Sequence, residues 1–265
     1  MKVVKFGGSS MADANQYRKV RDILLADPER RVVIVSAAGK RFGADHKITD
    51  LLYLCYAHTQ YGVDCSNIFE MIRSRYLEIR DELGIRLDLE SDFAALKSGL
   101  DRKLVSQDEL ASRGEYFSAK LMAAYLGFDF VDAADWVRFK YDGTVDQAAT
   151  YELLKERDKG FGMVIPGFYG RMPDGKIRTF SRGGSDITGA LAAAALDADV
   201  YENWTDVSGI LMADPRIVDD PATIPEVTYD ELRELSYSGA QVLHEGTIFP
   251  VREKNIPLNI RNTNA

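Results

Sequence analysis

A continuous run of β-branched residues near the N-terminus limits the folds that this chain can adopt. Residues 31–36 (RVVIVS) contain four consecutive apolar residues with no polar residue between them. Such a run is typical of a parallel strand covered on both faces, because a strand with one face in water would alternate apolar and polar residues. The chain therefore needs helices on both sides of a sheet, which favours an α/β fold.

The remaining chain alternates between predicted strands and predicted helices. Short apolar segments predict strands at residues 2–6, 128–133, 163–166, 176–180, 200–204 and 256–262, with a hairpin turn at 172–175. Apolar residues at helical spacing predict helices around residues 17–24, 48–52, 65–83, 89–104, 112–125, 151–154, 190–196, 229–237 and 240–254. This alternation implies a mostly parallel sheet between two layers of helices.

The composition excludes several functional classes. Hydrophobic residues make up 46% and charged residues 28% of the 265, as in ordinary globular proteins, and the net charge of −8 argues against a nucleic-acid or membrane partner. The cysteines, Cys55 and Cys65, form no CxxC motif and give no case for zinc. We see no signal peptide and no apolar stretch of about 20 residues, so we expect a cytoplasmic protein.

Small-residue turns follow three of the predicted strands, at residues 7–9 (GGS), 36–39 (SAAG) and 181–189 (SRGGSDITG). In open α/β sheets, ligands bind outside the carboxyl ends of strands, and helix N-termini attract anions. With Lys5, Arg182 and Arg216 as cations, these turns predict a site for a phosphorylated ligand. Residues 40–47 (KRFGADHK) predict a polar, mobile loop.

Each candidate also has a purely structural interpretation. Lys5 could be a solvated lysine at a strand end, and Arg182 and Asp186 could be a surface residue and a helix cap. Thr49 could equally cap a helix or bind a ligand. Glu115, placed near the start of a predicted helix, could be a partner of the helix dipole or could bind an ammonium group.

Several well-known motifs are absent from the sequence. It has no GxxxxGK[ST], no HRD or DFG, no GxGxxG after the first strand and no GxSxG. These absences argue against a P-loop enzyme, a protein kinase, a dinucleotide-binding dehydrogenase and a serine hydrolase. The three histidines, His46, His58 and His244, lack a catalytic pattern and are predicted to be structural.

Five motifs in order resemble those of the aspartokinases, in the amino acid kinase superfamily. They are KFGGSS (5–10), SRGE (112–115), SRGGSD (181–186), WTDVSGI (204–210) and ADPR (213–216), and the resemblance extends from residue 1 to about 263. It implies a three-layer αβα sandwich that transfers the ATP γ-phosphoryl group to the side-chain carboxylate of L-aspartate. The product, 4-phospho-L-aspartate, leads toward lysine, threonine and methionine. A glutamate or uridylate kinase, or a weakly active binding subunit, is the alternative.

The resemblance also implies roles for individual residues. Lys5 would stabilise the transferring phosphoryl group, and Asp186 would position Lys5. The implied substrate-binding residues are Ser36, Thr49, Glu115, Phe168, Arg182 and Ser185, with Glu115 on the ammonium group and Arg182 on the α-carboxylate. The implied nucleotide-binding residues are Lys5, Gly7, Gly8, Ser9, Thr205, Asp206, Arg216 and Gln241. Mg²⁺ is expected to be bound mostly by ATP and water, with no dedicated protein metal site.

The sequence departs from the family pattern near the nucleotide. Many aspartokinases carry a lysine in a GAKVLHP segment, which here is GAQVLHE (239–245), so Gln241 supplies no charge. Arg216, Lys40 and Arg41 are candidates to replace that charge. Leu211 stands where the family often has tyrosine.

The resemblance divides the chain into a substrate half, residues 1 to about 170, and a nucleotide half, about 171 to 265. Aspartokinases usually continue into ACT domains that bind feedback inhibitors, whereas this sequence ends at Ala265. The sequence is compatible with a truncated or a naturally short form, and we expect no ACT-mediated feedback by lysine or threonine only if nothing follows. The oligomeric state stays open, and a homo-oligomer is compatible with the sequence.

Overall fold

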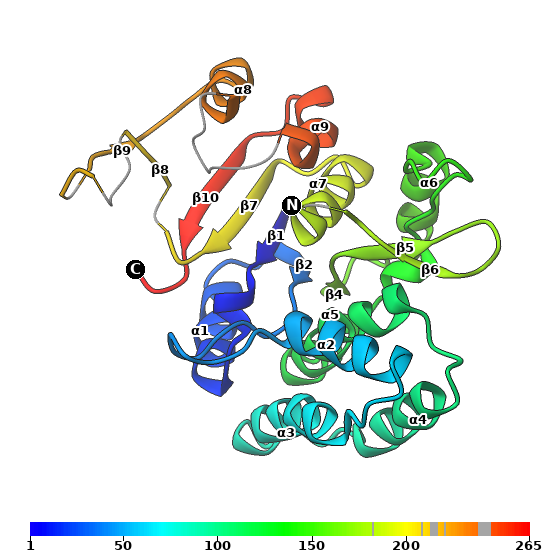
Figure 1. Cartoon of the computed structure of the whole chain (residues 1–265). Coiled ribbons are helices and arrows are strands. Elements are labelled where there is room, and N and C mark those ends of the chain that lie inside the picture. Colours follow the sequence, from blue (N-terminus) through cyan, green and yellow to red (C-terminus); the bar gives the residue numbers. More distant parts are fainter. Residues whose placement is uncertain (182, 208, 213–216, 220, 238–244) are drawn as a thin grey trace.

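The computed structural model describes residues 1–265 apart from 182, 208, 213–216, 220 and 238–244. Within the described residues, a six-stranded sheet has the order β10-β7-β1-β2-β4-β3 (Figure 1). Its strands are β1 (Lys2–Phe6), β2 (Arg30–Val35), β3 (Asp129–Phe130), β4 (Met163–Pro166), β7 (Val200–Thr205) and β10 (Leu258–Asn262). Every neighbouring pair is parallel, which confirms the predicted parallel sheet.

Helices cover both faces of this sheet. On one side, α1 (Ala14–Leu25) and α5 (Gln107–Leu126) contact the sheet, and α2 (Ile48–Gln60), α3 (Ser66–Glu82) and α4 (Glu90–Asp101) extend the same core outward. The other packs against α6 (Gln147–Arg157), α7 (Gly184–Ala195), α8 (Tyr229–Tyr237) and α9 (Glu245–Glu253). Val33 and Val35 of β2 belong to the first core, and Val32 and Ile34 to the second. The run is continuously apolar because its alternate residues enter two cores, so the predicted αβα architecture is confirmed.

Two antiparallel hairpins lie outside the main sheet. They pair β5 (Tyr169–Arg171) with β6 (Ile177–Thr179) and β8 (Ile210–Leu211) with β9 (Thr223–Ile224), and the first confirms the turn predicted at 172–175. The strand predicted at 128–133 is shorter, because Asp132 accepts a hydrogen bond from Ala134 N–H and starts a 3₁₀ turn at Ala133–Asp135.

Helix α5 begins earlier than predicted. Its N-cap is Ser106, whose hydroxyl accepts a hydrogen bond from the backbone N–H of Glu109. This Ser-x-x-Glu spacing is a capping-box signal. Glu115 therefore lies in the third turn of the helix, and the expectation that residues 112–115 open it was wrong.

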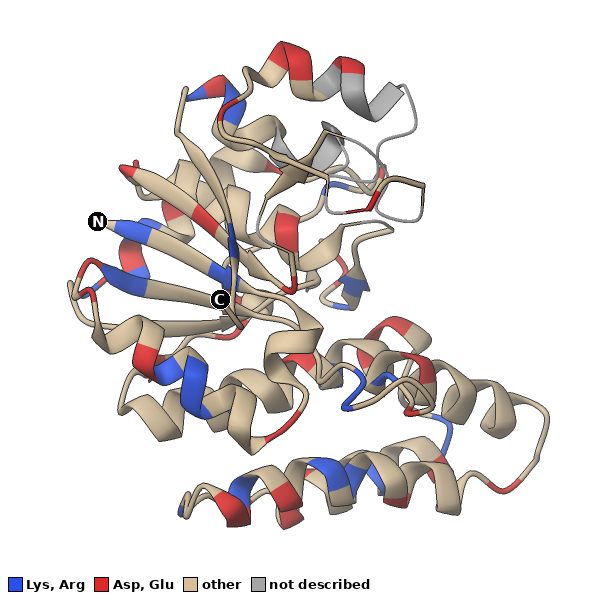
Figure 2. Ribbon diagram, turned by 90° about the vertical axis from the view of Figure 1, so that its left-hand side faces the viewer, with Lys and Arg blue, Asp and Glu red and all other residues tan. Residues whose placement is uncertain are grey.

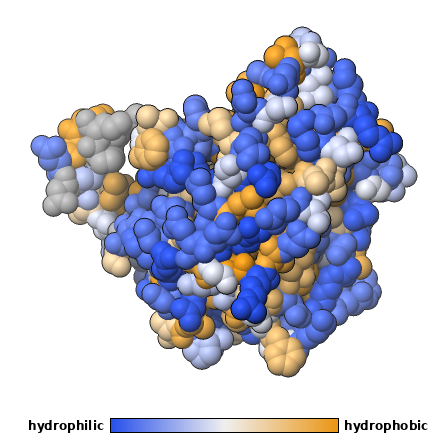
Figure 3. All heavy atoms as spheres, turned by 90° about the horizontal axis from the view of Figure 1, so that it is seen from below, coloured by the Kyte–Doolittle hydropathy of each residue, from blue (hydrophilic) through white to orange (hydrophobic). Residues whose placement is uncertain are grey.

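The charged residues are interspersed along the chain. Figure 2 shows Lys and Arg alternating with Asp and Glu on the outer helices and the sheet, so an anionic ligand would depend on local cations. Figure 3 shows a largely hydrophilic face on which apolar side chains emerge in patches. Among the described helices, none has the length and apolar character needed to cross a membrane.

Candidate active site

The candidate site lies where β1, β2 and β7 end together. Gly7 N–H donates to the carbonyl of Trp204 at 3.0 Å, and Ser36 N–H donates to that of Phe6 at 3.1 Å. The turns after these three strands thus start from one edge of the sheet, whereas the predicted turn at 181–189 follows β6 of the separate hairpin and leads into α7. The chain proceeds from β1 to β2 on one side and reaches β7 on the other, and such a switch point is where open α/β sheets bind ligands.

Lys5 lies in a buried polar cluster at this edge, together with Asp186 and Asn203. Its Nζ lies 2.8 Å from Asp186 Oδ1 of α7 and 3.3 Å from Asn203 Oδ1 of β7, and only 8% of Lys5 is exposed. Asn203 Nδ2 donates to Asp186 Oδ1 at 2.9 Å. The Lys5–Asp186 contact matches the expectation, whereas sequence reasoning missed Asn203. The position of Asn203, next to Trp204 at a strand end, was the signal that could have found it.

The N-terminus of α7 is shaped by two adjacent glycines. Gly183 has φ +58°, a left-handed conformation that favours glycine, and a Cβ on Gly184 would lie 2.3 Å from the ring of Phe168. Phe168 itself has φ +83°, and its N–H donates to Thr188 Oγ1 at 3.1 Å. Ser185 packs against Gly167.

A close approach between two turns forms the floor of the site. Gly39 N–H donates to the carbonyl of Gly8 at 2.8 Å, so the turn after β2 lies directly on the turn after β1. A Cβ on Gly39 would stand 2.6 Å from the carbonyl carbon and oxygen of Gly8. Only glycine fits here, because the obstacle is backbone.

We expect Gly39→Ala to damage both folding and activity. The added methyl group forces the turns apart, which should cost about 1–3 kcal/mol of unfolding free energy. Gly43→Ala is the matched control, since Gly43 lies in the adjoining loop and a Cβ added there would have no described atom within 4 Å. Thermal denaturation of both variants checks this, and equal stability of the two would contradict the steric account.

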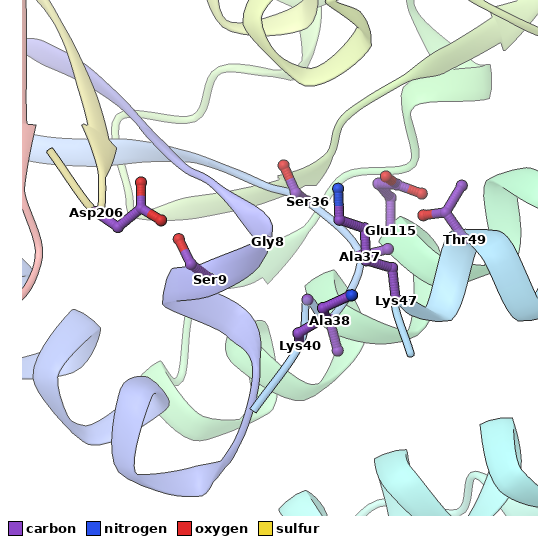
Figure 4. Close-up of a pocket in the computed structure, with 11 residues that line it drawn as sticks. Gly8, Ser9, Ser36, Ala37, Ala38, Lys40, Lys47, Thr49, Glu115 and Asp206 are labelled. Carbon is purple, nitrogen blue, oxygen red and sulfur yellow. The ribbon is translucent and has the colours of Figure 1, made fainter. Parts of the chain in front are cut away.

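An open pocket of about 420 Å³ begins at this floor (Figure 4). Its lining consists of Gly8, Ser9, Ser36, Ala37, Ala38, Gly39, Lys40, Lys47, Thr49, Glu115 and Asp206. The first residue of α2 is Ile48, so Thr49 lies inside the helix and faces the pocket instead of capping. The pocket therefore brings together residues from α2, α5 and the turns after β1, β2 and β7, which are far apart in sequence.

Glu115 is a buried carboxyl group at the end of this pocket. Only 5% of the residue is exposed, and its Oε2 has no hydrogen-bond partner among the described residues. Burial raises the pKa of Glu115 to about 8, because backbone hydrogen bonds from Ala37 and Glu115 itself offset only part of the desolvation. A ligand cation placed against Oε2 would restore the ionised form.

The other predicted site residues fall into three groups. Asp206 lines the pocket and accepts a hydrogen bond from Thr205 Oγ1 at 3.1 Å, and Gly7 lies beside Lys5 Nζ. Phe168 and Ser185 do not line the pocket, although both belong to the turns around α7. Arg182, Arg216 and Gln241 lie outside the described residues. Sequence reasoning missed Lys47, because its loop was predicted only as polar and mobile.

A family model and a curated relative each match nearly the whole chain, including the segments that form the site. The model of the amino acid kinase family matches residues 1–262. The chain belongs to the amino acid kinase family. Over its whole length it is 39% identical to Aspartokinase 3 of Bacillus subtilis (strain 168), covering 61% of that protein. The chain thus spans about three fifths of the length of this curated relative.

Solved structures agree with this family assignment. The crystal structure of Clostridium acetobutylicum aspartate kinase matches the whole chain with a TM-score of 0.92 and 49% identity, and the chain covers 60% of it. E. coli aspartokinase III in complex with aspartate and ADP matches the whole chain with a TM-score of 0.85 and 28% identity, and the chain covers 62% of it. The aspartokinase resemblance of the five motifs is confirmed.

Proposed function

We propose that this chain is the catalytic part of an aspartate kinase, which transfers the γ-phosphoryl group of ATP to the side-chain carboxylate of L-aspartate. The observation that carries the proposal is Glu115, a buried carboxyl group whose Oε2 has no partner among the described residues, in a pocket that also contains the Gly8–Gly39 contact. Such a group suits the ammonium of an amino acid, for which a uridylate kinase has no need. The likeness to aspartokinases, one of them in complex with aspartate and ADP, supports it.

The chemistry requires little beyond alignment and charge neutralisation. A carboxylate is already ionised near neutral pH, so its oxygen can attack the γ-phosphorus without a general base. One phosphorus–oxygen bond forms to aspartate as the bond to the bridging oxygen of ADP breaks, and no proton moves. The protein must therefore bring two anions together and stabilise the charge on the transferring group.

Lys5 is the residue best suited to that stabilisation. Asp186 and Asn203 hold its ammonium group at the end of β1, and the desolvated position strengthens its attraction for a phosphoryl oxygen. Gly7, Gly8 and Ser9 follow on the same turn, where backbone N–H groups can approach the phosphates closely. In this proposal Lys5 acts on the transferring group and Asp186 orients Lys5.

The remaining roles separate into a substrate side and a nucleotide side. On the substrate side, Glu115 takes the ammonium group, with Ser36 and Thr49 as pocket hydroxyls. Phe168, Ser185 and Arg182 stay proposed for this side, and Thr205, Asp206, Arg216 and Gln241 for the nucleotide. Residues up to about 170 then form the substrate half and about 171–265 the nucleotide half, in a protein of amino-acid biosynthesis.

Magnesium fits this site only as an ion bound to the phosphates of the nucleotide. The described residues contain no group of three or more His, Cys, Asp or Glu side chains placed to hold a metal ion. Asp206 offers one carboxylate on the side of the pocket near Ser9 (Figure 4). Mg²⁺ would therefore be bound mostly by phosphate and water oxygens, where it would neutralise phosphate charge.

An acceptor assay tests the proposed function. The protein is incubated with MgATP, hydroxylamine and one acceptor, and an acyl phosphate is trapped as a hydroxamate. We expect hydroxamate from L-aspartate and none from L-glutamate. With UMP, whose phosphorylated product is a phosphoanhydride that hydroxylamine does not trap, we expect no release of ADP. A product from glutamate would favour the glutamate kinase alternative, and no turnover with any acceptor would favour a binding subunit.

A further inference from the structure

Two lysines of one short loop line the pocket, and no acidic side chain of the described residues pairs with either. The loop, residues 40–47, connects Gly39 to α2, and Lys40 and Lys47 both face the pocket. Within the described part of the chain, the side chain of Lys47 makes no hydrogen bond or ion pair, and Lys40 Nζ donates only to the carbonyl of Gly43 at 3.4 Å. Their positive charges are therefore free to act on a ligand.

The third cation of this loop, Arg41, is already paired with acidic side chains. Arg41 Nε lies 2.9 Å from Asp45 Oδ2, and Arg41 Nη1 lies 3.4 Å from Glu78 Oε2. Hydrogen bonding to Asp45 raises the pKa of the Arg41 guanidinium above its ordinary value, although burial opposes this. Arg41 is thus a structural cation, in contrast to Lys40 and Lys47.

A buried ion cluster holds the loop in place. Arg75 of α3 lies 2.7 Å from Asp45 and donates to the carbonyl of Gly39 at 3.1 Å, and Asp45 is only 7% exposed. Burial alone would raise the pKa of Asp45, but hydrogen bonds from Arg41 and the backbone of His46, together with the charge of Arg75, outweigh it and hold that pKa well below its ordinary value. Ile48 N–H closes the loop on the carbonyl of Ala38 at 3.1 Å. These contacts do not support the predicted mobile loop, and they fix the backbone that carries Lys47.

Lys47 and Glu115 offer opposite charge to one ligand. In Figure 4 the Lys47 side chain extends past Ala37, and its amino group lies between Ser36 and Glu115 in this view. Glu115 Oε2 has no hydrogen-bond partner among the described residues, Lys47 included. The pocket thus presents an ammonium and a carboxyl group at separate points. A small molecule that carries both a carboxylate and an ammonium would match them.

We propose that Lys47 binds the side-chain carboxylate of the substrate and so selects a dicarboxylic amino acid as the acceptor. This proposal rests on the proposed aspartate kinase function. The acceptor carboxylate must approach the γ-phosphate, and a nearby ammonium group reduces the repulsion between the two anions. As the new phosphorus–oxygen bond forms, the carboxylate loses negative charge. Lys47 therefore contributes more to substrate binding than to the transition state, and its loss raises KM more than it lowers kcat.

The test replaces Lys47 by methionine, which keeps the apolar stem and removes the charge. We expect KM for aspartate in the hydroxamate assay to rise about 10- to 100-fold, the usual range for one charge-assisted hydrogen bond, with a smaller change in kcat. ADP binding, measured by calorimetry, should be unchanged. Lys47→Arg should recover part of the affinity. Lys140→Met, at an exposed lysine outside the pocket, is the matched control.

Binding of L-asparagine separates carboxylate recognition from general damage. Asparagine keeps the α-carboxylate and the ammonium but lacks the acceptor charge. The unmodified protein should bind aspartate more tightly than asparagine, and Lys47→Met should remove this preference. An unchanged preference, or equal loss of both ligands, would overturn the role of Lys47. If the unmodified protein forms no aspartyl hydroxamate, the proposed function fails instead, and the two binding measurements still test Lys47.

Discussion

Replacement of Lys5 by methionine should lower kcat by about 10²- to 10³-fold, as loss of one transition-state donor usually does, while ADP binding changes far less. Lys5 Nζ is the ammonium group held by Asp186 and Asn203 at the end of β1, where charge develops on the transferring phosphoryl group. Methionine keeps most of the side-chain volume, so the packing of β1 against β7 is retained. Turnover in the hydroxamate assay and calorimetry with ADP measure the two effects.

Lys2→Met is the matched control for this variant. Lys2 lies at the opposite end of the same strand, where its Nζ pairs with Asp27 at 2.6 Å, far from the carboxyl edge of the sheet. We expect its kcat to remain that of the unmodified protein. Near-normal turnover in Lys5→Met would exclude the proposed role of Lys5, and equal losses in both variants would indicate damage to β1.

Glu115→Gln should make the unliganded protein more stable and its aspartate affinity much weaker. Because burial raises the pKa of Glu115 to about 8 from 4.5, the folded protein holds this proton more tightly than the unfolded chain does. The stability that this proton contributes is complete below pH 4.5, the pKa of the group in the unfolded chain, and is lost as the pH rises to about 8, its pKa in the folded protein. The loss in unfolding free energy is on the order of a few kcal/mol. Glutamine never ionises and avoids this cost.

The pH dependence of both properties checks this prediction. The Tm advantage of Glu115→Gln should grow from about pH 6 to about pH 8, as the linkage of proton binding to folding requires. Aspartate affinity of the unmodified protein should rise by up to about tenfold per pH unit over the same range, since an ionised Glu115 is needed to bind the ammonium group. The variant should show a high KM without that slope. Glu109→Gln, on the same helix, is the control, and a slope that survives in Glu115→Gln would assign the titration to another group.

Much of the fold could be predicted because its signals are local. The bounds of β1 and the positions of β2, β4 and α8 follow from apolar periodicity within a few residues, and the structure confirms them. Helix α7 exists as predicted but begins at Gly184, before the predicted start at residue 190. The start of α5 was missed, although the capping box at Ser106 and Glu109 was present in the sequence. The shortened β3 depends on a single side-chain hydrogen bond to Asp132, which periodicity does not detect.

The turns of the candidate site could be predicted from the sequence, but the roles of its charged loop residues could not. The five motifs identified the turns, and the pairing of Lys5 with Asp186 was expected from the aspartokinase resemblance. Which loop cation faces the ligand was not predictable, because Lys40, Arg41 and Lys47 look equivalent in sequence. The difference arises from Asp45, which is buried against Arg75 and forms an ion pair with Arg41. Arg41 therefore does not line the pocket, whereas Lys47 does.

The sequence by itself determined the αβα architecture, since a continuous apolar strand needs cover on both faces, and it predicted the turns after β1 and β2 at the carboxyl edge. Only the tertiary structure decided how Glu115 behaves. A glutamate in a helix has an ordinary pKa until its neighbours exclude water, and those neighbours come from α2 and from the turn after β2. Desolvation depends on this long-range packing, which local sequence patterns do not encode.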